Sequence, residues 1–381
     1  MGAAVVVVVM LISVNVSGHL GSAATINSGF PARIFNVMSY GASNDGSRDN
    51  RKAFLMAWND ACAYPGRGRV VIPAGGRFAL GSVTFEGRCN GTMSFIIHGT
   101  LIAPTDPNLF FTNTWIGFRY VDALIIKGGG FLDGQGHAAW NYNDCNTNSN
   151  CHALPATLRL DFVRNSWIHH LRSINSKNTH FSLFACDNVK ISNVRLDAPA
   201  HSPNTDGIHI GSSSNIKILN SAIRTGDDCV SMVSGTHAID IEGDVSGISV
   251  RNTTFVGTDN GVRIKTWAPS LQSSASNITF QDINMIDVTN PIIIDQDYCP
   301  SSHCLEGESA VQIEDVLFKN IHGTSRSKVA VKLQCSGARP CKNVKLVNIA
   351  LAYNGRRGHA MALCVNVLGS SFGTQIPGGC L

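Results

Sequence analysis

The stretch "NVKISNVRL", residues 188–196, carries the short pattern that decides the fold. A polar residue is followed by apolar-x-apolar, then by asparagine, then by another apolar residue. Alternation with a period of two is typical of a strand buried on one face only, because successive side chains of a strand point to opposite faces. The stretch is therefore predicted to be half-buried β-structure.

The same pattern recurs along the C-terminal two thirds of the chain. It appears as "SWIHHLRSI" from Ser166, "NVKISNVRL" from Asn188, "NIKILNSAI" from Asn215, "GISVRNTTF" from Gly247, "NITFQDINM" from Asn277, "AVQIEDVLF" from Ala310 and "NVKLVNIAL" from Asn343. The copies begin 22, 27, 32, 30, 33 and 33 residues apart, and the short strands "GIHI", "CVSMV", "GVRIK" and "PIIID" lie between them. Recurrence at such intervals indicates a solenoid.

A parallel β-helix is the solenoid that fits this pattern. Little helical periodicity lies between the strands, which argues against βαβ units and leucine-rich repeats. An antiparallel sandwich would need hairpin turns such as Asn-Gly between neighbouring strands, and such turns do not dominate. We therefore predict an all-β chain whose coils stack at the strand spacing of about 4.8 Å.

One segment near the start has the pattern of an amphipathic helix instead. Residues 49–62, "DNRKAFLMAWNDAC", place five apolar side chains on one helical face: Ala53, Phe54, Met56, Ala57 and Ala61. The end coil of a solenoid has an unpaired strand edge, which invites aggregation. We predict that this short helix caps that end.

The composition is that of a large folded chain. Its 381 residues are 44% hydrophobic and 15% charged, which is enough for one long domain or two ordinary ones. The net charge of +4 fits a polyanionic partner. No run of lysine and arginine among aromatic residues indicates a nucleic-acid partner.

The N-terminal segment resembles a secretory signal. Residues 3–13 are apolar or small, too few to span a bilayer, and are followed by small polar residues. No other segment is apolar enough to be transmembrane. We therefore expect a signal segment over residues 1–24, cleaved between Ser17 and Ala24, and a single β-helix domain over residues 25–381.

Twelve cysteines support a secreted protein. Short-loop disulfides are expected for the close pairs Cys145/Cys151, Cys299/Cys304, Cys335/Cys341 and Cys364/Cys380, with Cys62/Cys89 as a fifth. Cys186 and Cys229 then remain, either as thiols or paired with each other. A zinc site is disfavoured because the chain has no Cys-x-x-Cys pair.

Three aspartates are candidates for catalysis. Asp206 lies in "SPNTDGIHI", and Asp227 and Asp228 lie in "TGDDC", 22 residues or one coil later. Stacked coils would bring them together, and neighbouring carboxylates shift each other's pKa values apart, as a general acid and a general base require. Two other interpretations stay open: the aspartates are turn residues, or they bind the calcium ion of a lyase.

Two cations follow in "NGVRIKTW", residues 260–267. Arg263 and Lys265 are two residues apart on a predicted strand, so they share one face, while Val262 and Ile264 share the other. Cations beside carboxylates would bind an anionic sugar, with arginine gripping its carboxylate by two hydrogen bonds. The alternative is that they lie on an ordinary solvated face.

At these residues the chain resembles the polygalacturonases, the glycoside hydrolases that hydrolyse pectin. The shared motifs are "SPNTDGIHI", "TGDDC" and "TDNGVRIKTW", with "FNVMSYGASNDGSRDN", "GGFLDGQGHAAWN" and "NPIIIDQDYCP". The resemblance covers nearly everything after the signal segment. It implies a right-handed parallel β-helix and an inverting, single-displacement cleavage of α-1,4-linked galacturonate.

The resemblance also implies roles for individual residues. Asp227 matches the general acid, and Asp206 and Asp228 match the pair that activates water. The substrate-binding positions are matched by Asn204, Arg263, Lys265 and Tyr298. The segments "YCPSSHC" and "QCSGARPC" look like those of the plant exo-acting branch.

One part of the family pattern is missing. The family carries a Gly-His-Gly motif, preceded by a cysteine, about one coil after the paired aspartates, and this chain has neither. The repeat shows the same gap, because "HAIDIEG" from His237 and "GISVRN" from Gly247 both look like coil starts but are only 10 residues apart. About one coil, on the order of 20 residues, is therefore predicted to be absent.

Three functions remain open at this point. The first is a polygalacturonase, endo- or exo-acting, with reduced or no activity, and the second is a pectin-binding homologue without turnover. The third is a calcium-dependent pectate lyase. We expect pectin or homogalacturonan as the partner, no cofactor or metal, no membrane or nucleic-acid partner, and a monomer that is secreted to the cell wall or extracellular space.

Overall fold

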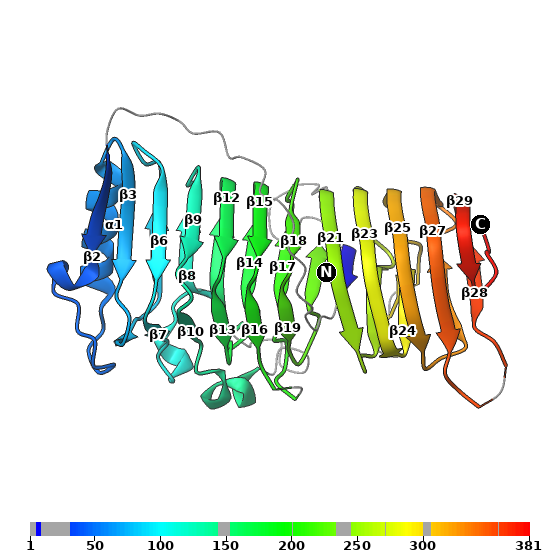
Figure 1. Cartoon of the computed structure of the whole chain (residues 1–381), viewed down its shortest axis with the longest axis horizontal. Coiled ribbons are helices and arrows are strands. Elements are labelled where there is room, and N and C mark those ends of the chain that lie inside the picture. Colours follow the sequence, from blue (N-terminus) through cyan, green and yellow to red (C-terminus); the bar gives the residue numbers. More distant parts are fainter. Residues whose placement is uncertain are drawn as a thin grey trace. The chain divides into compact units, whose positions relative to one another are not determined.

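The computed structural model describes residues 31–143, 153–199, 201–233, 245–270, 272–299, 306–356 and 358–381, together with the backbone of residues 5–8. The chain divides into two compact units. The N-terminal unit consists of Asn15–Ile208 and Arg224–Asp227, and the C-terminal unit of Met1–Val14, His209–Ile223 and Asp228–Leu381. Each unit is described separately below (Figure 1).

The N-terminal unit contains three parallel sheets. The first runs β2 (Ala32–Asn36), β3 (Arg67–Ile72), β6 (Met93–Ile97), β9 (Leu124–Lys127), β12 (Arg164–His169) and β15 (Asp187–Ser192). The second runs β5 (Val83–Glu86), β8 (Thr114–Arg119), β11 (Ala156–Asp161) and β14 (Phe181–Phe184). The third runs β4 (Arg77–Ala79), β7 (Thr100–Ile102), β10 (Phe131–Asp133), β13 (Arg172–Ile174) and β16 (Arg195–Asp197). Most coils add one strand to each sheet, which is the predicted parallel β-helix.

The C-terminal unit continues the same design with longer strands. One sheet contains β18 (Lys217–Leu219), β21 (Val245–Val256), β23 (Ser273–Val288), β25 (Val311–Ser325), β27 (Cys341–Tyr353) and β29 (Val367–Ile376), side by side in Figure 1. Another contains β22 (Asn260–Trp267), β24 (Asn290–Tyr298), β26 (Val329–Gln334) and β28 (Met361–Val365). All these neighbours are parallel. β17 (Ile208–Gly211) and β19 (Ala222–Arg224) cross the division between the units.

Asparagine marks the turns of each repeat. In the opening stretch, Asn188 and Asn193 have φ of 53° and 51°, in the left-handed region that asparagine tolerates better than other residues with a Cβ. The amides also stack from coil to coil: Asn188 Nδ2 donates to Asn165 Oδ1 at 2.8 Å, and Asn165 Nδ2 donates to Asp122 Oδ1 at 2.9 Å. The repeated asparagine therefore serves both as a turn residue and as a hydrogen-bonding partner for the next coil.

The predicted capping helix is α1 (Arg51–Ala63), which contacts β2, β3 and β5. Four of the five predicted apolar positions are buried, but Met56 is 45% exposed, so its placement on the buried face was wrong. Trp58 is fully buried in its place, two residues further along the helix. The described residues of the unit also contain short 3₁₀ turns: η1 (Val37–Tyr40), η2 (Pro107–Leu109), η3 (Gly136–Ala138) and η4 (Trp140–Tyr142).

The cysteines agree with the predicted pairing wherever the structure describes both partners. Disulfides join Cys62 to Cys89, Cys335 to Cys341 and Cys364 to Cys380. Cys299 is disulfide-bonded, while Cys145, Cys151 and Cys304 lie outside the described residues. Cys186 and Cys229 are both buried thiols, which decides between the two alternatives for them. Burial raises the pKa of the Cys186 thiol to about 12, so this thiol is protonated and unreactive.

The two sheets of the C-terminal unit differ where a coil was predicted to be absent. β18 pairs directly with β21, with Lys217 opposite Ser249. β20 (Val230–Val233), in contrast, ends its own sheet, and β22 pairs with β24 on one side and antiparallel with β1 (Val5–Val8) on the other. One strand position, that of β1, thus separates β20 from β22 and from the parallel strands that follow β22. His237 and the first predicted coil start, residues 237–243, lie outside the described part, whereas the second, from Gly247, lies in β21.

Stability of the N-terminal unit should depend on an aromatic cluster beneath α1. Phe95 is fully buried and its ring lies 5.0 to 6.4 Å from those of Phe85, Phe118, Trp58 and Phe54. Phe95→Ala should lower the free energy of unfolding by about 3–5 kcal/mol, because it removes buried surface and leaves a cavity. Denaturant unfolding measures the change. Phe111→Ala, at a side chain 89% exposed, is the control and should change it by less than about 0.5 kcal/mol. Equal effects of the two substitutions would contradict this packing.

Candidate functional site

The strand β22 presents two cations on one face, as predicted. Val262 and Ile264 are fully buried, so alternation points Arg263 and Lys265 to the other side of the strand. Both cations are nevertheless well shielded, with side chains 13% and 10% exposed. The two cations are therefore largely shielded from solvent, unlike the side chains of an ordinary solvated face.

Tyr298 and Asp295, on the neighbouring strand β24, surround these cations. The guanidinium of Arg263 and the ammonium of Lys265 each lie 4.7 Å from the centre of the Tyr298 ring. Arg263 Nη2 is 3.7 Å from Asp295 Oδ2, and the ring of Trp267 packs edge-on against Tyr298 at 5.2 Å. Aromatic faces attract cations, so Tyr298 holds both side chains in place.

Lys265 also reaches one of the candidate catalytic carboxylates. Its Nζ donates to Asp228 Oδ2 at 3.1 Å, and the Asp228 side chain is only 15% exposed. The structure thus brings together Asp228, Arg263, Lys265 and Tyr298, four of the seven candidate site residues, within the C-terminal unit. The predicted substrate-binding lysine is engaged with the predicted base.

Arg263 has an unused hydrogen-bond donor. Its Nε is buried and has no hydrogen-bond partner within the described residues. A buried donor without a partner costs about 1–3 kcal/mol, which a ligand acceptor would recover. The same guanidinium is held from two sides by Tyr298 and Asp295. This arrangement suits the carboxylate of a bound sugar acid.

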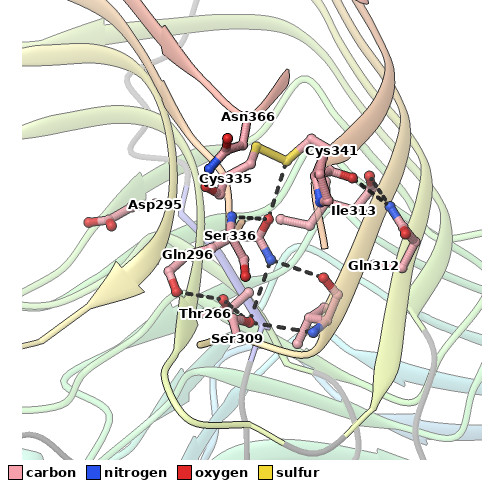
Figure 2. Close-up of a disulfide and its surroundings, with 12 residues drawn as sticks. Thr266, Asp295, Gln296, Ser309, Gln312, Ile313, Cys335, Ser336, Cys341 and Asn366 are labelled. Atoms are coloured by element: carbon pink, nitrogen blue, oxygen red, sulfur yellow. Dashed lines mark hydrogen bonds between the residues drawn. A yellow bond between two sulfur atoms is a disulfide. The ribbon is translucent and has the colours of Figure 1, made fainter. Parts of the chain in front are cut away.

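A buried polar network holds the strands beneath these residues (Figure 2). Gln296 is fully buried and donates to Val311 O at 2.9 Å, while its Oε1 accepts from Ser336 N at 3.2 Å. Thr266 Oγ1 and Ser309 Oγ are 2.7 Å apart. Gln296 and Thr266 alternate with the outward-facing residues, so the network fixes where β22 and β24 present their site side chains. The disulfide Cys335–Cys341 borders the same network.

The N-terminal unit holds the other three candidates, Asn204, Asp206 and Asp227. Thr205 Oγ1 accepts a hydrogen bond from Gly226 N at 2.9 Å, which ties the segment of Asp206 to that of Asp227. A Cβ on Gly226 would lie 2.0 Å from Ser202 O, so only glycine allows this approach. Asn204 has a φ of 52°, a turn conformation that asparagine tolerates. The "SPNTDG" motif and residues 225–227 are therefore packed against each other within the N-terminal unit.

His180 supports the backbone at Asp206. Its backbone N donates to Asp206 O at 2.7 Å, and its imidazole Nδ1 lies 2.7 Å from Ser173 Oγ. The ring is completely buried, and this burial lowers the pKa of His180 to about 3. His209 lies between the buried Ile208 and Ile210, and its Nδ1 is 2.8 Å from Ser231 Oγ.

The burial of His180 predicts acid sensitivity. Its pKa is about 6.5 in the unfolded chain and about 3 in the folded one, so below pH 6.5 the unfolded state binds more protons. Stability should be complete above pH 6.5 and fall progressively toward pH 3, with a loss from this residue of about 3 kcal/mol between pH 7 and pH 4. Denaturant unfolding across this range, compared with His180→Gln, isolates the contribution. Parallel curves for the two proteins would contradict it.

The described residues contain neither a group of three or more His, Cys, Asp or Glu side chains arranged to hold a metal ion nor a helix long and apolar enough to cross a membrane.

The family model for glycosyl hydrolases family 28 matches residues 62–244 and 242–372. These two stretches include all seven candidate site residues and most of the chain. The chain belongs to glycosyl hydrolase family 28. It is also 40% identical to an exopolygalacturonase of Platanus acerifolia over 367 residues, covering 90% of this chain and 97% of the relative. An exopolygalacturonase of Oenothera organensis is 41% identical, with 87% of this chain and 98% of the relative covered.

A solved structure supports the same fold. The crystal structure of an exopolygalacturonase from Thermotoga maritima aligns with a TM-score of 0.71 at 20% identity, covering 89% of this chain and 92% of that one. The right-handed parallel β-helix predicted for this family 28 hydrolase is thereby confirmed.

Sequence reasoning missed several residues around the cations. Asp295 and Gln296 lie in "NPIIIDQDYCP", which had been singled out as a motif without a role for either residue. Parity along β24 could have assigned them, because Ile292 and Ile294 are buried and Asp295 pairs with Lys265 across the sheet. Trp267 likewise lies in a quoted motif, "TDNGVRIKTW", in which it had been given no role.

Proposed function

We propose that this chain binds pectin through galacturonate and hydrolyses its α-1,4-galacturonosyl bonds with inversion, acting from chain ends. The observation that carries the proposal is the shielded cation pair Arg263 and Lys265, held by Tyr298 beside the carboxylate of Asp228. Two cations on one face of β22, one of which has an unused buried donor, fit a sugar that carries a carboxylate.

The proposed mechanism uses the three aspartates. Asp227 acts as the general acid and protonates the glycosidic oxygen of the leaving group. Asp206 and Asp228 position and deprotonate a water molecule, which attacks the anomeric carbon from the opposite face in one displacement. The ammonium of Lys265 lies 3.1 Å from the Asp228 carboxylate that this role uses. Asn204 and Tyr298 help to bind the substrate.

The remaining properties follow the family. The exopolygalacturonases of Platanus and Oenothera, together with the "YCPSSHC" and "QCSGARPC" segments, favour exo action. We propose a monomer that needs no cofactor or metal. Its catalytic domain would span residues 25–381 as a single β-helix after a signal segment over residues 1–24, with pectin of the cell wall as its substrate.

We further propose that turnover is impaired by the absent coil. Two observations support this. The family model matches in two stretches that meet at residues 242–244, where the repeat predicted the gap, and one strand position separates β20 from β22. A coil there would carry the family's Gly-His-Gly. The ion pair of Lys265 with Asp228 would hold the lysine at the base instead of at the substrate.

A pectin-binding homologue without turnover is the alternative that this ion pair favours. It would retain Arg263 and Lys265 and the polysaccharide partner but would not hydrolyse the polysaccharide. A calcium-dependent pectate lyase would instead require added calcium and would release unsaturated products that absorb in the ultraviolet.

The proposal predicts binding that exceeds turnover. The protein should bind polygalacturonate, and Arg263→Gln should weaken that binding about tenfold or more, because a charge-assisted pair of hydrogen bonds is lost. Release of reducing ends should be about 10²-fold or more below that of the Platanus exopolygalacturonase, because a proton-transfer aid is missing. Binding assays and a reducing-sugar assay on the same preparation measure both.

Each alternative gives a different result in this experiment. Binding with no release of reducing ends would favour the binding homologue. Calcium-dependent ultraviolet absorbance would favour the lyase. Hydrolysis at the rate of the Platanus enzyme would contradict the impairment, and no binding at all would contradict the proposed function.

A further inference from the structure

A second guanidinium faces outward from the sheet that leads to Asp206, and the proposed reaction does not use it. Arg159 lies on β11 between Leu158 and Leu160, which are 2% and 1% exposed. Alternation therefore places Arg159 on the outer face of the sheet, together with Asp161. The Arg159 side chain is 25% exposed, so it is shielded yet accessible.

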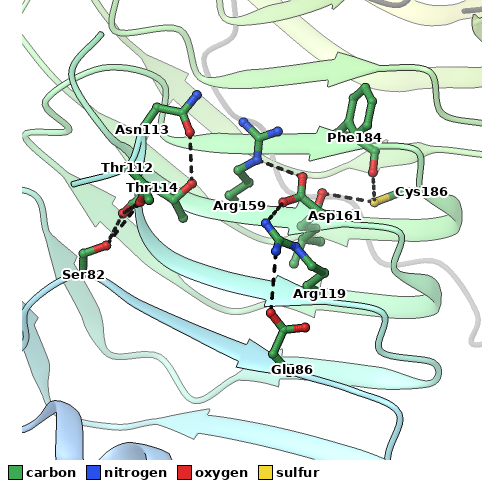
Figure 3. Close-up of polar contacts among 11 residues, drawn as sticks. Ser82, Glu86, Thr112, Asn113, Thr114, Arg119, Arg159, Asp161, Phe184 and Cys186 are labelled. Carbon is green, nitrogen blue, oxygen red and sulfur yellow. Dashed lines mark hydrogen bonds and ion pairs between the residues drawn. The ribbon is translucent and has the colours of Figure 1, made fainter. Parts of the chain in front are cut away.

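Among the described residues, the polar contacts of the Arg159 side chain lie along one edge (Figure 3). Its Nε is 2.8 Å from Asp161 Oδ1, and the second oxygen of Asp161 is 3.5 Å from Arg119 Nη2. Arg119 in turn lies 3.7 Å from Glu86. The contact through Nε leaves both terminal amino groups pointing away from Asp161, as Figure 3 shows. Two parallel donors held in one plane match the two oxygens of a carboxylate.

The neighbours of Arg159 leave room for a ligand. In the register of the sheet, Arg159 lies opposite Gly117 of β8 on one side and Ser182 of β14 on the other. Neither side chain is long enough to cover the guanidinium. The guanidinium is therefore covered by neither neighbour in the sheet, in keeping with the 25% exposure of its side chain.

Arg159 is separated from the Asp206 segment by a single strand of the sheet. Only β14 separates β11 from the segment of Asp206, because Phe181 N donates to Gly207 O at 2.9 Å and His180 N donates to Asp206 O at 2.7 Å. Two strand spacings correspond to roughly 10 Å. This distance suits a neighbouring sugar of the same chain better than the sugar that is cleaved.

We propose that Arg159 forms a further subsite that binds the carboxylate of a galacturonate residue beyond the cleavage point. Asp161 positions the guanidinium, and Arg119 positions Asp161. This inference rests on the proposed function, because it assumes a substrate with a carboxylate on every sugar. Arg159 would favour the binding of longer, unesterified chains, a role separate from that of the cations on β22.

Binding of galacturonate oligomers of increasing length tests the subsite. Calorimetric titration of the full chain is carried out with digalacturonate and with longer oligogalacturonates. Arg159→Gln should weaken binding of the longer oligomers about tenfold to a hundredfold and leave digalacturonate binding unchanged. Arg159→Lys should recover part of the affinity, because it keeps the charge and loses the planar fork.

The chain contains a matched control. Arg195 on β16 also bonds through Nε to the aspartate two residues later, Asp197, at 3.0 Å, and Asp197 is shared with a second arginine, Arg224, at 2.7 Å. The sequences are Arg-Leu-Asp in both places, but β16 belongs to a different sheet. Arg195→Gln should therefore remove an equivalent ion pair without affecting oligomer binding. Equal thermal unfolding of the two variants excludes a general loss of structure.

The outcomes separate this inference from the proposed function. Loss of length-dependent affinity in Arg159→Gln but not in Arg195→Gln supports the subsite. Unchanged affinity in Arg159→Gln, with weakened binding in Arg263→Gln, overturns the subsite and leaves the proposed function intact. Failure of the unmodified chain to bind any oligomer overturns the proposed function itself, and the subsite with it.

Discussion

The stacking of one coil on the next, sealed at the turns by asparagine side chains, is the constraint on which the rest of this structure depends. Asn188, Asn165 and Asp122 form one such hydrogen-bonded stack in the N-terminal unit. In the C-terminal unit, Asn348 donates to Asn320 at 3.1 Å and Asn320 to Asp282 at 2.7 Å. Because each turn also needs the left-handed backbone, the same residue fixes both the bend and the register.

This constraint converts sequence spacing into distances across the site. A residue one coil further along the chain lies one strand spacing away, so the number of coils between two side chains decides whether they meet. Lys265 and Asp228, 37 residues apart in the sequence, meet in an ion pair. Contacts in a solenoid are made between neighbouring coils, so the loss of a coil would alter the site while leaving the packing on each side intact. Family membership and impaired turnover are therefore compatible.

Much of this could be predicted from the sequence, and the exceptions have physical reasons. The repeat revealed the strands, and parity placed Arg263 and Lys265 on one face. Helical periodicity was less reliable, because Met56 and Trp58 are only two positions apart, and the end coil buries the larger side chain. The network of Thr266, Gln296 and Ser309 joins residues 13 to 43 positions apart, which no local pattern reveals. Arg159 is similarly inconspicuous until the register shows Gly117 and Ser182 beside it.

The most direct measurement of the central claim adds the coil that is proposed to be absent. A segment of about 20 residues carrying a Cys-Gly-x-Gly-His-Gly motif would be inserted between His237 and Gly247, and release of reducing ends from polygalacturonate would be compared with that of the unmodified chain. The account predicts that the rate rises by about 10²-fold or more, with polygalacturonate binding retained. An unmodified chain that already hydrolyses polygalacturonate as fast as the folded insertion variant would contradict it.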